Sequence, residues 1–399
     1  MDVKEIQRII KEKEQIHGSD FENVNHFIFQ NPELGMQEYV SSKYLVDFLK
    51  RKGFRVTFPY AGFDTAFRAE FGTRGPLFAF LAEYDALPGY GKQKKNGHSC
   101  GHNWIASTAA GAAVTLSEVA EEFGLRVAVI GTPAEETYGT KVEMVNQGVF
   151  DDVDVAFQTH LSHETSTVSA ALAMDARIFE YKGKASHSAG APWDGINALD
   201  AVQLLYSGIN AYRQHVKPDV RIHGVVTEGG QAANIVPDKA SCLFYIRAAQ
   251  RNYLNDVVHQ VENIAKGASL MTGAKLKIQK PELPMDNLIN IPLLQDLAEA
   301  YFSDNGIVPT VTPEMAAQYA GSTDVGNVSH ACPTAYVEVG LDGPDIFYAH
   351  EESALKLVDS PQALKRMHQA ICAMAGMAVD LTQKPEQIQQ AKKQLEERK

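Results

Sequence analysis

Residues 77–88 read LFAFLAEYDALP, an apolar run followed at once by acidic residues. An apolar run without the alternation of a half-exposed strand predicts a strand that is covered on both faces. Such strands belong to α/β sheets with helices on each side. Because ligands collect at the carboxyl ends of strands in open α/β sheets, Glu83 and Asp85 become candidates for a functional site.

The sequence on either side continues the alternation of short strands and helices. Two helices are expected within residues 4–50, and a strand at 66–71 precedes the strand at 77–82. Downstream we expect a small-residue helix at 104–123, a strand at 127–130, a helix at 141–147 and a strand at 153–158. This alternation favours an α/β domain with a mixed sheet flanked by helices.

The pattern changes near residue 175 and changes back after residue 288. Between them we expect a strand at 175–182, a helix at 198–214, strands at 220–227 and 239–248, a helix at 252–271 and a strand at 275–279. This order of elements is that of a ferredoxin-like α+β unit with an antiparallel sheet. Afterwards we expect a helix at 291–303, a strand at 335–339 and a helix at 361–382.

The simplest architecture is therefore an α/β domain interrupted by an inserted α+β domain. The discontinuous domain would comprise residues 1–174 and 286–399, and the inserted domain residues 175–285. The charged tail at 384–399 is expected to end a helix or to fray.

Composition and charge exclude several classes of protein. The 399 residues carry a formal net charge of -12, and the densest basic run, Lys92 to Lys95, is expected to be a solvated loop. The chain therefore lacks the basic face that nucleic-acid binding requires. No apolar run is long enough for a membrane span or a signal peptide, so we expect a cytoplasmic protein without a membrane partner.

The four cysteines show no paired spacing and are expected to be free thiols or metal ligands. Cys242, Cys332 and Cys372 lie in apolar surroundings that are typical of a core. Cys100 instead lies in the polar run NGHSCGH at residues 96–102. Cys100 is therefore the cysteine that is a candidate for a functional site.

Side chains that bind metals follow four of the expected strands. They are Glu83 and Asp85, Glu135 and Glu136, His160, and His350. Each alone also fits a structural role, because an acidic pair suits a solvated helix start and a single histidine is more often structural. Their coincidence at strand ends, together with Cys100 and His102, predicts a metal site.

Seven motifs occur in order along the chain: NPELG at 31–35, DALP at 85–88, HSCGHN at 98–103, TPAEE at 132–136, GKASHS at 183–188, ANIVPD at 233–238 and GSTDVG at 321–326. With His160 and His350, they resemble the dinuclear-metal aminoacylase and carboxypeptidase family. The resemblance is strongest to its branch of aminoacylase-like amidohydrolases and p-aminobenzoyl-glutamate hydrolases. It spans residues 25 to 375 and includes the same split architecture.

The resemblance implies two divalent metal ions and five ligands. Cys100 would take the bridging position that other branches give to an aspartate. The other ligands would be His102 and His160 on one metal, and Glu136 and His350 on the other. Asp85 would orient a ligand histidine, and Glu83 stands where other branches carry one. Sulfur and imidazole ligands suit zinc, with manganese, cobalt and nickel as alternatives.

The resemblance also implies the catalytic groups. Glu135 would act as general base toward water and return the proton to the leaving amine. His187 resembles the histidine that stabilises the oxyanion, often from the partner subunit of a dimer. Asn234 and Arg247 match positions that bind the substrate carboxylate, Arg247 as a bidentate partner. Residues 322–324 are expected to line the pocket.

The expected activity is metal-dependent hydrolysis of the amide bond in N-acyl amino acids, dipeptides or aminobenzoyl-glutamate-like substrates. A noncatalytic binding relative is the alternative, which the presence of Glu135 and all five ligands opposes. A dinuclear phosphoesterase fits less well, because a thiolate bridge and the lack of a phosphate-binding basic cluster speak against it.

At two places the sequence departs from the pattern of the family that it resembles. Asn103 replaces the more usual aspartate, and Glu351 with Glu352 replaces proline or threonine, which leaves the specific substrate open. We expect a homodimer through the inserted lid or dimerisation domain, near residues 198–212, and a tetramer is an alternative.

Overall fold

The computed structural model describes residues 1–399 except 92, 94, 319–320 and 344. Two residues of the basic run at 92–95 therefore lie outside the described residues. The chain divides into two compact units, one of Met1–Ala170 with Leu288–Lys399 and the other of Ala171–Asn287. Each unit has its own hydrophobic core.

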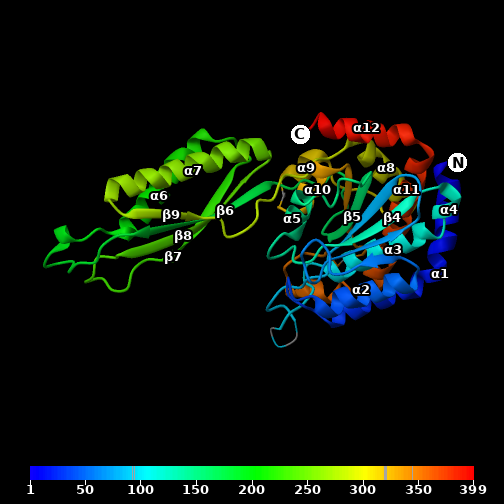
Figure 1. The fold of residues 1–399 in the computed structure, drawn as a ribbon, viewed down its shortest axis with the longest axis horizontal. Helices are drawn as coiled ribbons and strands as arrows, with labels where there is room; N and C mark the ends of the chain where they lie inside the picture. Colours follow the sequence, from blue (N-terminus) through cyan, green and yellow to red (C-terminus); the bar gives the residue numbers. More distant parts are fainter. Residues whose placement is uncertain (92, 94, 319–320, 344) are drawn as a thin grey trace. The chain divides into compact units, whose positions relative to one another are not determined.

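The first unit is built on a six-stranded mixed sheet, which confirms the expected fold class (Figure 1). Its order is β1 (Arg55–Thr57), β2 (Phe67–Phe71), β4 (Arg126–Gly131), β3 (Leu77–Ala82), β5 (Val155–Ser162) and β10 (Thr334–Gly340). Strands β4, β3, β5 and β10 are parallel, and β1 and β2 form an antiparallel edge. All six residues of β3 are buried, as a strand covered on both faces requires.

One strand extends further than the sequence indicated. The expected strand at 153–158 would place His160 beyond its end, whereas β5 continues to Ser162 and pairs His160 with Glu338 of β10. The pairing partner, which lies far away in the sequence, extends the strand.

The helices of the first unit pack around this sheet. They are α1 (Val3–Gln30), α2 (Tyr39–Arg51), α3 (His102–Ser117), α4 (Ala120–Phe123), α5 (Thr140–Asn146), α8 (Pro292–Asp304), α9 (Pro313–Gln318), α10 (Val325–Ala331), α11 (Pro361–Gln383) and α12 (Pro385–Glu396). Helix α3 is buried along its whole length and contacts α1, α11 and β3. Its small residues allow this close approach, since a Cβ added at Gly111 would overlap the side chain of Ile371.

Two details of the helices differ from expectation. The helix expected at 104–123 is two helices, α3 and α4, because the α-helical bonding breaks at Glu118 and Val119. The tail is neither a helix end nor frayed, but a separate helix, α12. Its Ile388, Ala391 and Leu395 are buried, and this apolar face holds it on the first unit.

The second unit has the expected order of elements. These are β6 (Ala173–Lys182), α6 (Ala198–Tyr212), β7 (Arg221–Glu228), β8 (Lys239–Ala248), α7 (Arg251–Thr272) and β9 (Lys275–Gln279). They form an antiparallel sheet of order β7-β8-β6-β9, with α6 and α7 together on one side (Figure 1). Residues of β8 alternate between more and less buried, as one covered face requires.

Two further expectations concern the cysteines and the membrane. All four cysteines are free, and Cys242, Cys332 and Cys372 are buried as expected, whereas the burial of Cys100 was not indicated by its polar run. Among the described residues, no helix combines the length and the apolar character that crossing a membrane would need. The cytoplasmic location stays a prediction.

Candidate metal centre

The parallel strands of the first unit bring the candidate residues together at one edge of the sheet. Strands β3 and β4 are in register to their last residues, with Ala82 opposite Gly131. The segments that carry Glu83 and Glu135 therefore leave the sheet side by side. His160 lies on β5, the other neighbour of β3.

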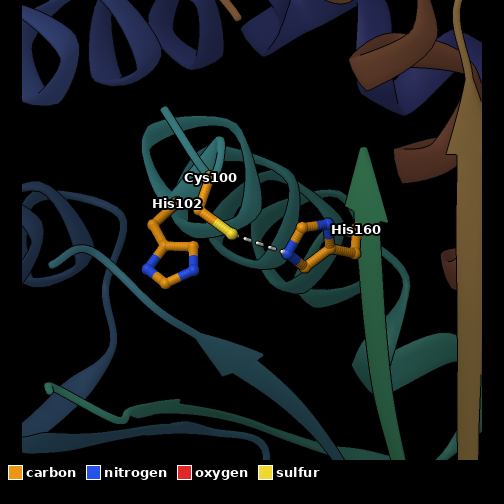
Figure 2. Close-up of side chains that lie close together, drawn as sticks. All are labelled: Cys100, His102 and His160. Carbon is orange, nitrogen blue, oxygen red and sulfur yellow. Dashed lines mark hydrogen bonds between the residues drawn. The ribbon is translucent and has the colours of Figure 1, made fainter. Parts of the chain in front are cut away.

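The backbone at Gly101 orients the first two candidate ligands. Gly101 precedes α3 in the left-handed region, with φ of 82°, which favours glycine. Cys100 thus ends the preceding loop and His102 begins the helix. Figure 2 shows the Cys100 sulfur between the rings of His102 and His160, with Sγ 3.5 Å from His160 Nε2.

Two non-glycine residues of the site also adopt positive φ angles: Ala134 at 58° and His350 at 63°. Such conformations cost free energy and persist where the surroundings hold them. The Ala134 amide donates to Glu38 Oε1 at 2.8 Å, and the His350 amide donates to the Ser99 carbonyl at 3.0 Å. The strain therefore lies where Glu135 and His350 must take fixed positions.

Among the described residues, four groups of three residues have ligand atoms within 4.8 Å of one another, a spacing that could hold a metal ion. Two of them contain Glu135: His102, Glu135 and Glu136, and Glu83, Glu135 and Asp324. The other two are Cys100, His102 and His160, and Cys100, Glu136 and His350. Cys100 is common to these last two groups, the arrangement that a bridging thiolate requires. In the last group, His350 Nε2 lies 3.1 Å from Glu136 Oε1.

The hydrogen bonds of His102 and His160 leave one nitrogen of each ring for a metal. His102 Nδ1 lies 2.7 Å from Asp85 Oδ1, and His160 Nδ1 lies 2.6 Å from the Leu161 carbonyl oxygen. Since both partners are acceptors, each Nδ1 carries the proton and each Nε2 presents a lone pair. His102 Nε2 is buried and has no hydrogen-bond partner among the described residues. A metal ion is the partner that this nitrogen fits.

The electrostatics of the site also fit bound cations. Burial, followed by the charges of Glu83 and Glu136, raises the pKa of Glu135 well above its ordinary value. Burial and the charge of Glu136 likewise raise the pKa of the Cys100 thiol. Divalent cations among these atoms would lower both pKa values, because they favour the charged forms. The donor set therefore fits two metal ions.

A buried lysine beside the ligands was missed by the sequence reasoning. Lys141 is fully buried, and its Nζ lies 2.6 Å from Glu83 Oε1 and 2.6 Å from Asp324 Oδ1. Although burial opposes it, the charges of Asp324 and Glu83 hold the pKa of Lys141 above its ordinary value. The only sequence feature that could have indicated the burial of Lys141 is its place between the small Thr140 and the apolar Val142.

Glu38 is a second group that the sequence reasoning missed. It is buried and accepts hydrogen bonds from the Ala134 amide at 2.8 Å and the Thr65 hydroxyl at 2.9 Å. Burial, together with the nearby charge of Asp85, raises the pKa of Glu38 to about 7. Glu38 thus supports the turn before Glu135 from the start of α2, where nothing in the sequence links it to the site.

Comparison with known proteins identifies the family. The model of peptidase family M20/M25/M40 matches residues 79–375, a range that includes all five candidate ligands. The chain belongs to this family. Its fold and its membership confirm the resemblance that the motifs indicated, and the M20 chain is a hydrolase of carbon–nitrogen bonds.

Two relatives and one solved structure are similar to this chain. The human Xaa-Arg dipeptidase is 33% identical over 91% of this chain and 85% of its own length. A p-aminobenzoyl-glutamate hydrolase subunit of Escherichia coli is 34% identical over 68% of this chain and 59% of its own length. A solved M20 peptidase of Bacillus subtilis that binds two metals shares the fold with a TM-score of 0.68, covering 92% of this chain and 99% of that one at 21% identity.

Three candidate residues of this M20 chain lie in the second unit. His187 Nδ1 accepts hydrogen bonds from the amides of Ala189 at 3.2 Å and Gly190 at 3.0 Å, which leaves Nε2 as the donor. The Ser188 amide donates to the Asn234 carbonyl, so the segments of His187 and Asn234 lie side by side. Arg247 lies on β8 and is partly buried. The roles of all three stay predictions.

The first departure from the family pattern has a structural role. Asn103 is buried, and its Nδ2 donates to Asn25 Oδ1 at 3.0 Å and to the Val358 carbonyl at 3.2 Å. These contacts join α3 to α1 and to the loop before α11. Asn103 thus fastens the helix that begins at His102.

Proposed function

We propose that this protein is a dinuclear-metal amidohydrolase that cleaves the amide bond of an N-acyl amino acid, a dipeptide or an aminobenzoyl-glutamate-like substrate. The observation that carries the proposal is the position of Cys100 in two adjacent groups of ligand atoms, with Glu135 beside them. A ligand shared by two metal ions and a neighbouring carboxylate that can act as a base suit the two-metal hydrolysis of an amide.

The proposed ligands are Cys100, His102 and His160 for one ion and Cys100, Glu136 and His350 for the other. Zinc suits sulfur and imidazole donors, and manganese, cobalt and nickel are alternatives. The ions would polarise the substrate carbonyl and lower the pKa of bound water. Asp85 positions His102 through the contact of 2.7 Å and so keeps the ring in the tautomer that binds metal.

Glu135 is the proposed general base. It follows Ala134, whose left-handed conformation turns the chain after β4, and it directly precedes the proposed ligand Glu136. As a carboxylate, Glu135 accepts the proton of the attacking water at one of its oxygens. It then donates that proton to the leaving amine nitrogen, which would otherwise depart as an unstable anion.

The second unit supplies the proposed substrate contacts. His187 carries its proton on Nε2, since Nδ1 accepts two backbone hydrogen bonds, and Nε2–H would donate to the oxyanion of the tetrahedral intermediate. Arg247 would bind the substrate carboxylate as a bidentate partner, and Asn234 would add a further donor.

The names of the relatives support a substrate class. The human relative is an Xaa-Arg dipeptidase, and the Escherichia coli relative belongs to a p-aminobenzoyl-glutamate hydrolase. In both kinds of substrate, the amine released by hydrolysis belongs to an α-amino acid with a free carboxylate. We therefore expect the substrate of this protein to present that carboxylate beside the scissile amide.

The protein is further proposed to form a homodimer through its second unit, with a tetramer as the alternative. Strand β7 is an edge strand of the sheet and carries two exposed apolar side chains, Val225 at 60% and Val226 at 48% exposure. An exposed edge with apolar side chains favours pairing. Light scattering of the eluted protein would test this, and a monomer at micromolar concentration would contradict it.

The main experiment measures metal content per chain together with hydrolysis of N-acetyl amino acids, Xaa-Arg dipeptides and aminobenzoyl-glutamate. We expect two metals per chain, activity that a chelator removes, and a loss of roughly 100-fold or more in kcat for Glu135→Gln with its metals retained. Glu122→Gln, at an exposed position on α4, is the matched control. A protein that binds no metal and cleaves none of these substrates would instead be the noncatalytic binding relative.

A further inference from the structure

A third group, made of carboxylates alone, lies beside the two groups of ligand atoms that share Cys100. Oxygen atoms of Glu83, Glu135 and Asp324 lie within 4.8 Å of one another, a spacing that could hold a metal ion. The set contains only carboxylate oxygens, the ligands preferred by hard cations such as manganese and magnesium. It also contains the proposed general base, whose binding to a metal would remove it from proton transfer.

Lys141 already supplies a cation to this group. Its Nζ lies 2.6 Å from Glu83 and 2.6 Å from Asp324, and its side chain is fully buried. Its backbone amide also donates to the second oxygen of Asp324, at 3.1 Å. Asp324 is therefore held at both oxygens by one residue, at the start of α5.

The charge balance of the site depends on the ammonium group of Lys141. When all are ionised, the five carboxylates of Glu83, Asp85, Glu135, Glu136 and Asp324 and the Cys100 thiolate carry six negative charges. Two divalent ions and Lys141 supply five positive charges, which leaves one negative charge. Without Lys141, two negative charges remain, and these match one more divalent cation. Buried charges require such compensation.

We propose that Lys141 is a tethered cation that closes the third group, of carboxylates alone, to metal ions and so keeps Glu135 from binding a metal in that group. The inference rests on the proposed function for the role of Glu135. Lys141 is thus a positioning residue, and it limits the site to two metals. Replacing its charge should turn the group of Glu83, Glu135 and Asp324 into a third metal site.

The test compares metal content after equilibration with manganese and removal of free ion by gel filtration. Lys141→Met should hold one more manganese per chain than the wild type. Lys141→Met combined with Asp324→Asn should return to the wild-type number, because the third group then loses a ligand. Lys141→Arg retains the positive charge and should also hold the wild-type number.

The outcomes separate this inference from the proposed function. The wild-type metal number tests the proposed function, whereas the difference between wild type and Lys141→Met tests the inference. An equal number in both proteins would overturn the inference, as would an extra ion that persists in the double variant or appears in Lys141→Arg. Should Lys141→Met fail to fold by circular dichroism, Lys141→Gln retains hydrogen-bond donors, and the same expectation applies to it.

Discussion

Asp85 accepts two hydrogen bonds from different ligand residues: His102 Nδ1 lies 2.7 Å from one of its oxygens, and the Glu136 amide lies 3.0 Å from the other. One carboxylate thereby fixes the tautomer of a candidate ligand on α3 and the backbone of another after β4. Burial raises the pKa of Asp85, but the contact with His102 and the hydrogen bond from the Glu136 amide outweigh burial, and the net pKa is below its ordinary value. Asp85 thus stays ionised and accepts both bonds.

Asp85→Asn should weaken metal binding. An amide has one accepting oxygen, so its NH2 group would face either His102 Nδ1–H or the Glu136 amide. Partners of this kind typically change metal affinity or activity by roughly 10- to 100-fold. Chelator competition measures the affinity, with the exposed Asp256→Asn as control. An affinity equal to that of the wild type would contradict the role assigned to Asp85.

Cys100→Asp and Cys100→Ala should differ in metal content. Aspartate offers two oxygens that can bridge two ions, whereas alanine offers no ligand atom. We therefore expect two metals per chain in Cys100→Asp and fewer in Cys100→Ala. Cobalt-loaded wild type should show a thiolate-to-cobalt absorption band that Cys100→Asp lacks. Full metal content in Cys100→Ala would exclude a bridging thiolate.

Arg247→Ala should raise KM more than it lowers kcat. Hydrogen bonds to charged groups contribute about 1.5–3 kcal/mol, so KM should rise roughly 10- to 100-fold. Arg247→Lys should recover only part of this, because an ammonium cannot form the bidentate pair. A substrate whose carboxylate is amidated provides the control, since it should not distinguish the variants. Equal effects on both substrates would place Arg247 in a structural role.

Two Gly→Ala changes in helices of the first unit should have opposite effects on stability. A Cβ at Gly376 of α11 would overlap Gln7 Nε2 and would lie 2.7 Å from two ring atoms of the buried Tyr301, whereas the nearest atom to one at Gly18 of α1 is 3.4 Å away. Gly376→Ala should lower the free energy of unfolding by about 1–3 kcal/mol through overpacking. Gly18→Ala should raise it by about 0.5–1 kcal/mol, because alanine favours the helix.

Denaturant unfolding, followed by a probe in the first unit, measures both variants. A stabilising effect of Gly376→Ala would mean that Tyr301 moves aside without cost. A destabilising effect of Gly18→Ala would mean that His368, which lies 3.4 Å from the added Cβ, cannot adjust.

His368 should make stability depend on pH. Its Nδ1 lies 2.5 Å from Glu14 and its Nε2 lies 3.1 Å from Glu22. Burial lowers the pKa of His368, but these hydrogen bonds outweigh burial, and the net pKa is raised. A raised pKa means that the stabilisation is full below the unfolded pKa of about 6.5 and is lost as pH rises through the folded pKa.

The comparison of wild type with His368→Gln tests this dependence. The difference in unfolding free energy should be larger at pH 5.5 than at pH 9, because only the protonated ring forms two ion pairs. A difference that is constant across this range would contradict the expected role of the His368 charge.

Much of the fold could be predicted from the sequence because local patterns reflect burial directly. The continuous apolar run at 77–82 predicted a strand covered on both faces, and β3 is buried at every residue. The strands β8 and β9 have the expected bounds, since their turns and alternation are local features. The order of elements in the second unit was likewise predicted from the spacing of apolar residues within each segment.

The candidate ligands could also be found in the sequence, because parallel strands bring their carboxyl ends to one edge of a sheet. Glu83, Asp85, Glu135 and Glu136 follow β3 and β4, which are neighbours in register. The boundaries failed where a distant partner decides them: β5 continues to Ser162 because β10 pairs with it, and α12 forms because its apolar face is covered.

The chemistry-bearing residue types and their order along the chain were therefore set by the sequence itself. Tertiary structure alone decided that Lys141 lies between Glu83 and Asp324, and that Glu38 supports Ala134. These contacts join residues 58, 183 and 96 positions apart, so no local pattern records them. Burial makes such pairs necessary, because a charge removed from water needs a partner, and only the folded chain determines which partner it finds.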